Sequence, residues 1–170
     1  MISRHACPRY FEILEDTLVG SRVFCFEKLQ GPLDLIKHPK FYLFDNGVFN
    51  GLLNNFEPSL DRVGPLADQL VYNQLMHSGW AAGEDLKIST LRTRQGNEVD
   101  FIVEIKGKIF AIEVKYSDHI SMDDLEGLNF FNQIFPKNAG LLLFHMGQNE
   151  KKWGKIWSLP WQKGLQVMGL

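Results

Sequence analysis

The chain has 170 residues, of which 45% are hydrophobic, and its formal net charge is −2. This length suits one domain, or one domain with a small addition, and the charge argues against a strongly basic nucleic-acid-binding coat, although a local basic patch stays open. No run approaches the roughly 18 apolar residues of a membrane-spanning helix, and no signal-peptide pattern opens the sequence. Cys7 and Cys25 lack metal-ligand spacing and are expected to be reduced thiols. A cytoplasmic protein without membrane association is therefore expected.

Residues 1–58 predict a small α/β unit. A helix is expected within the first twenty residues, followed by short strands at residues 22–26 and 40–44 and a short helix that begins after Asp45. The order helix, strand, loop, strand resembles the second half of a winged-helix module, in which two strands form the wing. A small appendage that packs on the main domain is an alternative that the sequence supports at least as well.

The longest helix is expected from residue 60 or 61 to about residue 82, where Gly83 would stop it. A strand is expected at residues 86–93. A later helix would begin near Ser121, with Asp124 completing a capping box. The apolar run at residues 140–144 predicts a strand that is buried on both faces. The apolar stripe of the longest helix comprises Val63, Leu66, Ala67, Leu70, Val71 and Leu75.

Between these elements lies the most informative stretch, residues 98–115. Apolar and polar residues alternate along it on both sides of Lys106 and Gly107, which is the pattern of two half-buried strands. Gly107 supplies the positive φ that a short hairpin loop needs. With Lys106 and Gly107 as the loop, counting along both strands gives the register. The expected opposed pairs are Phe101–Ile112 and Val99–Val114 on a buried apolar face, and Asp100–Glu113 and Glu98–Lys115 on the other face.

The opposed acids suggest a metal site. Directly opposed Cβ atoms lie about 4.5–5.5 Å apart, so Asp100 and Glu113 would repel each other unless a cation such as Mg²⁺ or Mn²⁺ lay between them. Lys115 would share their face and could stabilise negative charge on a phosphate. The alternative is a solvated face on which Glu98 and Lys115 form an ion pair worth under about 1 kcal/mol. An acid that faces an acid favours the metal site, because a surface selected for stability would avoid that pairing.

These residues also carry a resemblance. Asp100, followed after twelve residues by Glu113-Val114-Lys115, resembles the Asp…(Asp/Glu)-x-Lys core of the PD-(D/E)xK, or restriction-endonuclease-like, superfamily. The wider stretches 94–101, 112–117 and 40–47 resemble a domain of unknown function at the C-terminus of predicted AAA-superfamily ATPases of bacteria and archaea. This resemblance covers nearly the whole chain.

The resemblance implies an α/β fold with the order helix-strand-strand-strand-helix-strand and a mixed sheet flanked by helices. Periodicity gives the same order independently. Residues 1–58 would be a partial winged-helix-like appendage with a linker helix, and residues 59–170 a PD-(D/E)xK nuclease-like domain.

The implied activity is metal-dependent phosphodiester hydrolysis. Asp100 and Glu113 would hold Mg²⁺ or Mn²⁺, and Lys115 would position or activate the attacking water. Asp68, on the longest helix, would join the metal site; the alternative is an ordinary solvated acid.

Possible nucleic-acid contacts lie beside this site and in the tail. Arg92 and Arg94 are expected at the end of the sheet that carries Asp100, where they would hold DNA phosphates or simply be solvated. Tryptophans and lysines alternate in the tail, which can bind nucleic acid. A strand and a short helix covering the sheet edge is the favoured interpretation. The tail residues are Trp153, Trp157 and Trp161 with Lys151, Lys152, Lys155 and Lys163.

The sequence contains no P-loop motif, so no ATP site is expected in this chain and the implied ATPase would be a separate module. Two hypotheses compete with the nuclease. The domain could be a non-catalytic DNA-binding or docking module of the ATPase, or a subunit-assembly domain that associates through its tail tryptophans.

Overall fold

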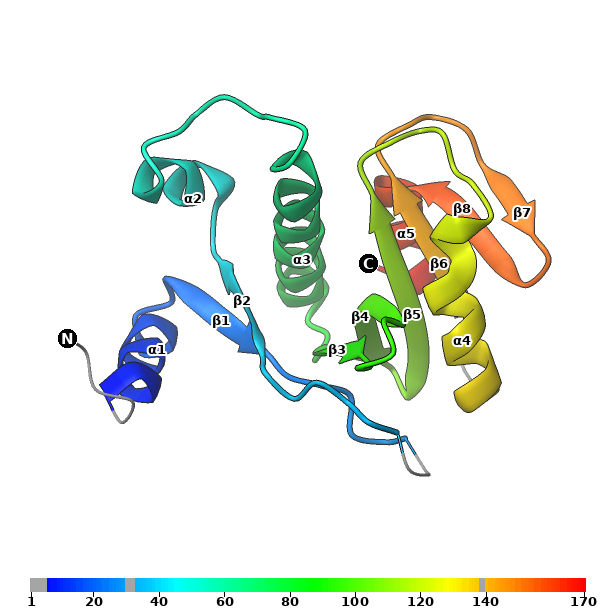
Figure 1. The fold of residues 1–170 in the computed structure, drawn as a ribbon, viewed down its shortest axis with the longest axis horizontal. Coiled ribbons are helices and arrows are strands. Elements are labelled where there is room, and N and C mark those ends of the chain that lie inside the picture. Colours follow the sequence, from blue (N-terminus) through cyan, green and yellow to red (C-terminus); the bar gives the residue numbers. More distant parts are fainter. Residues whose placement is uncertain (1–5, 30–32, 138–139) are drawn as a thin grey trace.

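Six strands form one mixed sheet in the computed structural model, which describes residues 6–29, 33–137 and 140–170 (Figure 1). The strand order is β3-β4-β5-β6-β8-β7. Strands β3, β4 and β5 pair antiparallel, β5, β6 and β8 pair parallel, and β7 pairs antiparallel with β8 at one edge. The strands are β3 (Lys87–Arg92), β4 (Glu98–Ile105), β5 (Lys108–Lys115), β6 (Gly140–His145), β7 (Lys151–Trp153) and β8 (Ile156–Pro160).

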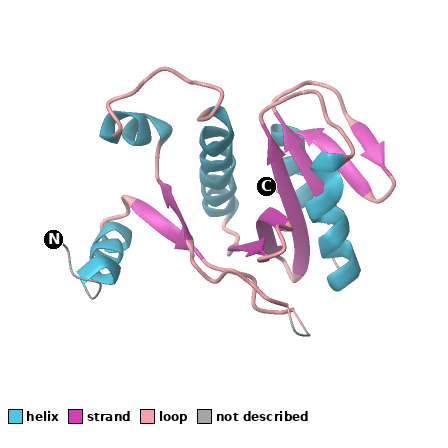
Figure 2. Ribbon diagram, in the orientation of Figure 1, coloured by secondary structure: helices cyan, strands magenta, loops and turns pink. Residues whose placement is uncertain are grey.

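Helices cover both faces of this sheet (Figure 2). Helices α3 (Val63–Ala82) and α5 (Trp161–Met168) share one hydrophobic cluster with one face. Helix α4 (Glu126–Ile134), which follows the short 3-10 turn η1 (Asp123–Leu125), packs in a second cluster on the other face. The predicted mixed α/β sheet flanked by helices is thus confirmed, and the predicted order is seen as α3, β3, β4, β5, α4 and β6.

The N-terminal part contains α1 (Ala6–Asp16), β1 (Gly20–Val23), β2 (Lys40–Leu43) and α2 (Asn46–Leu52). Strands β1 and β2 form a separate antiparallel pair. The backbone N–H of Leu43 donates to Oε1 of Gln69 at 3.1 Å, which ties β2 to α3. The predicted helices and strands of this part are confirmed in order. Its likeness to a winged helix and the division of the chain at residue 58 stay predictions.

Residues between β1 and β2 cover the outer edge of β3. The backbone N–H of Phe26 donates to the carbonyl of Thr90 at 2.8 Å, and that of Ile36 donates to the carbonyl of Arg92 at 2.8 Å. An uncovered edge strand offers unpaired backbone groups to other chains. The N-terminal part therefore completes the sheet on the β3 side.

The predicted hairpin turn is confirmed. Lys106 and Gly107 both have positive φ, 51° and 72°, as a two-residue type I′ turn requires. Ile105 pairs with Lys108, and Phe101 pairs with Ile112, as counting predicted.

Beyond Phe101 the predicted register is wrong. Ser89 pairs with Ile102 and Leu91 pairs with Val99, so one residue of β3 between these pairs faces two of β4, which carries an extra residue. Such a bulge bends the strand and turns its side chains. Val99 consequently packs in the cluster under α4, away from Phe101. In the described ladder of β4 and β5, the predicted pairs Asp100–Glu113, Val99–Val114 and Glu98–Lys115 are not formed.

The remaining elements differ from prediction mainly at their ends. Helix α3 starts at Val63 and ends at Gly83, which has a positive φ of 68°. At the start of the α4 region, N–H and Oγ of Ser121 both donate to the Asp124 carboxylate at 2.8 Å. The tail forms β8 and α5 against the sheet, as favoured. Among the described helices, none has the length and apolar character needed to cross a membrane.

Candidate active site

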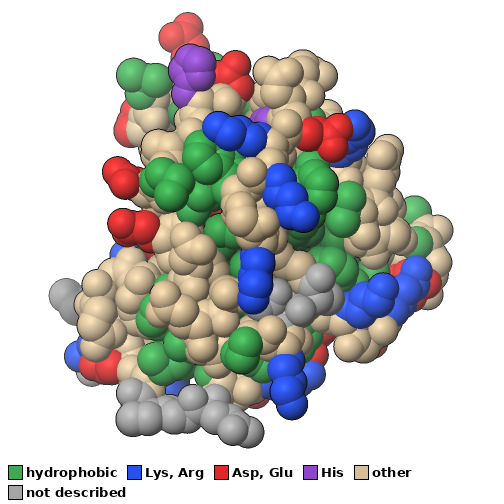
Figure 3. Space-filling view, turned by 90° about the vertical axis from the view of Figure 1, so that its right-hand side faces the viewer, with side chains coloured by type: hydrophobic (Ala, Val, Ile, Leu, Met, Phe, Trp, Pro, Cys, Tyr) green, Lys and Arg blue, Asp and Glu red, His purple; other side chains and the backbone are tan. Residues whose placement is uncertain are grey.

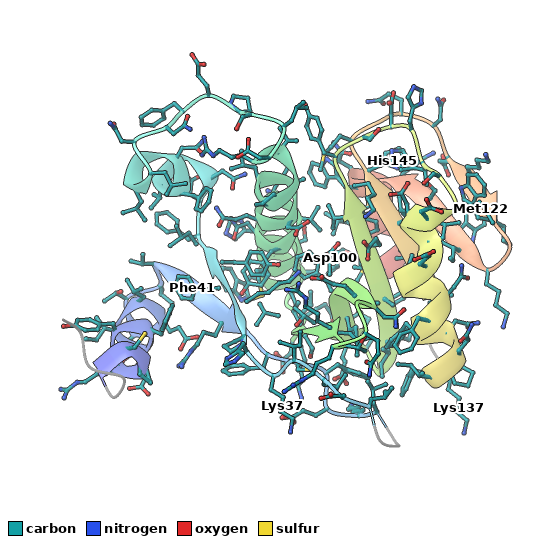
Figure 4. All side chains as sticks on the ribbon, in the orientation of Figure 1. Lys37, Phe41, Asp100, Met122, Lys137 and His145 are labelled. Atoms are coloured by element: carbon teal, nitrogen blue, oxygen red, sulfur yellow. The ribbon has the colours of Figure 1, made fainter. Side chains whose placement is uncertain are left out.

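Asp100 lies where β4 and β5 separate, and its two carboxylate oxygens have different partners. Oδ2 accepts a 3.0 Å hydrogen bond from the backbone N–H of Val114, and Oδ1 accepts one of 3.2 Å from Nζ of Lys40. The residue is only 8% exposed. In Figure 4 it sits in the middle of the molecule, between α3 and β5. Because the ladder of β4 and β5 ends here, the backbone N–H of Val114 donates to a carboxylate rather than to another strand.

Lys40, the first residue of β2, was not predicted as part of this site. Its ammonium also contacts Oε1 of Glu98 at 2.8 Å. Burial works against the charged form, but the attraction of Asp100 and of neighbouring acidic groups outweighs it, so the pKa of Lys40 is raised. Lys40 is thus held as a cation between two acids of β4.

Glu113 and Lys115 form the other half of the site. Nζ of Lys115 donates to Oε1 of Glu113 at 3.0 Å and lies 3.7 Å from Oδ1 of Asp124. Oε2 of Glu113 is buried and has no hydrogen-bond partner among the described residues. Burial, followed by repulsion from Asp100, raises the pKa of Glu113 to about 8. One oxygen of Glu113 is consequently free to bind a ligand.

Helix α4 approaches this half closely because residue 127 is glycine. A Cβ at Gly127 would lie 1.9 Å from the carbonyl oxygen of Glu98 and 3.5 Å from Oε2 of Glu113. No side chain fits at the first distance. The helix therefore closes over Glu113 and keeps its carboxylate away from water.

Asp68 reaches the site from α3, on the side of Asp100 and Lys40. Burial, followed by the charge of Asp100, raises the pKa of Asp68 to about 7. The hydroxyl of Tyr42 nearby is buried and lacks a partner within the part of the chain that the structure describes. Asp68 belongs to a pocket of about 270 Å³ lined by Lys40, Phe41, Tyr42, Phe49, Pro65, Asp68 and Gln69.

The two predicted arginines, Arg92 and Arg94, pair with different acids. Nε of Arg92 lies 3.5 Å from Oε2 of Glu98, so Arg92 is linked to the site through that acid. Nε of Arg94 pairs with Oδ1 of Asp34 at 3.2 Å, and its side chain is exposed. The structure thus brings Arg92, but not Arg94, to the acidic cluster. A role for either in nucleic-acid binding stays a prediction.

The acids meet at one end of the sheet, but they do not converge on one point. Within residues 6–29, 33–137 and 140–170, no group of three or more His, Cys, Asp and Glu side chains could jointly hold a metal ion. Asp100 and Glu113 are not the directly opposed pair that was expected, because the bulge in β4 separates them. The donor chemistry still suits a hard cation, since Oε2 of Glu113 is a carboxylate oxygen without a hydrogen-bond partner in the part of the chain that the structure describes.

The tail tryptophans are stacked with their own lysines. Nζ of Lys151 lies 3.6 Å from the ring centre of Trp153, and Nζ of Lys152 lies 4.9 Å from that of Trp157. Figure 3 shows basic side chains on this side of the molecule scattered among apolar and other ones. These contacts give the tail a structural use without nucleic acid.

The fold and the site together define a mixed α/β domain with a cluster of acids and lysines at the end of its sheet. Residues 63–163 match the model of a domain of unknown function, DUF4143, and the chain belongs to the DUF4143 family. This family is usually found with AAA ATPases. No curated protein matches the chain. Asp68, Asp100, Glu113 and Lys115 lie inside the matched residues, whereas Lys40 lies outside them.

Proposed function

We propose that this chain is a restriction-endonuclease-like domain that hydrolyses phosphodiester bonds of DNA with the help of Mg²⁺ or Mn²⁺. The observation that carries the proposal is the meeting of Asp100, Glu113 and Lys115 at the end of the sheet, where Oε2 of Glu113 is buried without a partner in the described structure. A buried carboxylate oxygen without a hydrogen bond is costly, and a bound cation would satisfy it.

Each residue has a role that follows from its position. Asp100 and Glu113 would hold the cation, and Asp68 stands near enough to feel the charge of Asp100. The chemistry supplied by a bound cation would be a lower pKa of the attacking water and screening of the phosphate. Lys115, beside Glu113, would orient that water and stabilise charge on the reacting phosphate.

The electrostatics of the site supports a cation. The pKa of Asp68 is raised to about 7 and that of Glu113 to about 8, in both cases by burial and then by Asp100. Ionisation of these two buried acids therefore costs free energy in the folded protein. A divalent cation would lower this cost.

The order of the elements and the family's association with AAA ATPases also support the proposal. Arg92, at the rim of the cluster, would contact a DNA phosphate. An ATPase partner would control access to DNA.

The test is a cleavage assay with single-stranded, duplex and branched DNA in Mg²⁺ and in Mn²⁺. Cleavage by the wild type is expected to fall by at least about a hundredfold in Asp100→Asn, Glu113→Gln and Lys115→Met, because each removes a group placed at the reacting phosphate. Glu104→Gln is the matched control, since Glu104 is also an acid of β4 paired with a lysine, Lys28. Absence of metal-dependent cleavage by a folded wild type on all substrates would contradict the proposal.

A non-catalytic docking or DNA-binding module of the ATPase is the second candidate. The observation that favours it is that Asp100 and Glu113 already have lysine partners, Lys40 and Lys115. In that case DNA or the ATPase would bind without cleavage, and Glu113→Gln would leave binding unchanged.

A further inference from the structure

Lys40 holds the one carboxylate oxygen of Asp100 that the backbone leaves open. Oδ2 of Asp100 is engaged by the backbone N–H of Val114, so Oδ1 is the oxygen that the backbone leaves more open to a cation. That oxygen already accepts from Nζ of Lys40 at 3.2 Å. A divalent cation and the lysine ammonium thus compete for the same atom.

The position of Lys40 is set by the N-terminal part of the chain. Lys40 pairs with Val23 in the β1–β2 ladder, and two residues later the Tyr42 ring stacks on Tyr72 of α3 at 4.6 Å between ring centres. The same ring lies 5.6 Å from that of Phe101, next to Asp100. Strand β2 is therefore anchored on both sides, and it delivers Lys40 to the site from outside the family match.

A second observation indicates that the pocket beside Lys40 takes a ligand. Tyr42 is only 6% exposed, and its hydroxyl has no partner among the residues described. Tyr42 is one of the residues that line a pocket together with Lys40 and Asp68. A buried hydroxyl is seldom left unsatisfied, so a cation-bound water or a substrate oxygen is its natural partner.

We propose that Lys40 is a built-in counter-cation that holds the Asp100 side of the site closed, and that a divalent cation binds by displacing the Lys40 ammonium from Asp100. This inference rests on the proposed metal-dependent function. The displaced ammonium needs to move little, because Glu98 already contacts it at 2.8 Å. Any movement of β2 would then change the metal affinity of a site in the family domain.

The experiment is a calorimetric titration of the full chain with Mn²⁺. Lys40→Met keeps the length of the side chain and removes its charge, and it is expected to tighten Mn²⁺ binding about tenfold, a usual size for coupling between two bound groups. Lys28→Met is the matched control. It removes a lysine charge from Glu104, another acid of β4, without touching Asp100, so it should change the affinity by less than about twofold.

The results of the Mn²⁺ titration distinguish the counter-cation from the metal site itself. Equal affinity of the wild type and Lys40→Met, with binding abolished by Asp100→Asn, would overturn the counter-cation and leave the metal site standing. Equal tightening by Lys28→Met would reduce Lys40 to a general charge effect and overturn the proposal as well. No binding by any variant would overturn both the counter-cation and the proposed metal site.

If Lys40→Met fails to fold, the wild type alone can be tested by reductive methylation and peptide mass spectrometry. Mn²⁺ should increase modification of Lys40 at least about threefold while leaving the exposed Lys137 unchanged, because an ammonium that loses one of its two acid partners reacts faster. Unchanged modification of Lys40 at saturating Mn²⁺ would overturn the proposal.

Discussion

At the scale of single residues, the two carboxylate oxygens of Glu113 lie in different surroundings. One oxygen is satisfied by Lys115, and the other is enclosed where α4 closes over the strand. The neutral form of the acid tolerates this enclosure better than the charged form. Glu113 is therefore expected to stay protonated in the folded protein until a cation binds.

The first prediction concerns pH. The folded pKa of Glu113, about 8, exceeds its ordinary value of 4.5, so the native state holds a proton that the unfolded chain releases. Stability is then lost as pH rises from about 4.5 to about 8. Glu113→Gln should raise the free energy of unfolding by about 1–3 kcal/mol at about pH 8.5 and leave it nearly unchanged at about pH 4, below the ordinary pKa of the acid. Urea denaturation at both pH values measures this.

Glu104→Gln serves as the control for that measurement, because Glu104 lies on the neighbouring strand β4 and pairs with Lys28 rather than with a residue of the site. Metal-free buffer with a chelator is required. A Glu113→Gln variant that is less stable than the wild type at about pH 8.5 would show that the carboxylate is well solvated there.

The second prediction concerns Gly127. Gly127→Ala should lower the free energy of unfolding by about 2–4 kcal/mol, because its Cβ would meet the Glu98 carbonyl at 1.9 Å and force α4 away from β4. Thermal and urea unfolding measure the loss. Gly51→Ala, in α2 with no atom within 4 Å of the added Cβ, is the matched control and should be neutral or stabilising. Equal free energies of unfolding for Gly127→Ala and Gly51→Ala would mean that α4 can move away from β4 without loss of stability.

At the scale of elements, local pattern predicted the hairpin well. Alternation and a Lys-Gly loop were enough for the turn and for the pairs from Phe101 to Ile105. The bulge was not predictable in this way, because no feature of residues 98–101 marks it. The predicted acids Asp100 and Glu113 are therefore not the directly opposed pair that was expected.

The contact between Lys40 and Asp100 could not be predicted from a sequence pattern. Lys40 lies 60 residues before Asp100 in the chain, and its contact depends on how β2 docks on α3. Alternation within residues 40–44 predicted the strand and gave no sign of which buried acid its first residue would meet.

The third prediction tests the docking of β2. Tyr42→Phe keeps the stacking on Tyr72 and Phe101 and removes the hydroxyl without a described partner, so the free energy of unfolding should stay equal or rise by up to about 1 kcal/mol. Tyr42→Ala should lower it by about 3–5 kcal/mol. Urea denaturation of the two variants separates the contribution of the ring from that of the hydroxyl. A loss above about 1 kcal/mol in Tyr42→Phe would reveal a hydrogen bond there.

At the scale of the whole molecule, the N-terminal part wraps around the β3 edge and reaches both faces of the sheet. Val23 and Tyr42 pack in the cluster on the α3 side, whereas Phe26 packs in the cluster on the α4 side. The order of the core elements could be read from periodicity, since each helix and strand is locally amphipathic or apolar. This wrapping could not, because it depends on contacts between distant parts of the chain.

The last prediction follows from that wrapping. Phe26 is 1% exposed, and its ring lies 6.0 Å from that of Phe131 and 5.6 Å from that of Phe135 at the end of α4. Phe26→Ala should lower the free energy of unfolding of the whole chain by about 3–5 kcal/mol in a single transition, since the cavity forms inside the shared core. Calorimetry and circular dichroism measure the transition.

Phe24→Ala is its matched control, because Phe24 lies two residues away in the same segment and is 53% exposed. Its effect should stay within about 1 kcal/mol. Phe26→Ala should also associate at high protein concentration in gel filtration, because loosening of this segment frees the backbone groups of β3. A second, separate transition that appears only for the N-terminal part would instead mean that this part folds on its own, and that the site receives Lys40 from an independent unit.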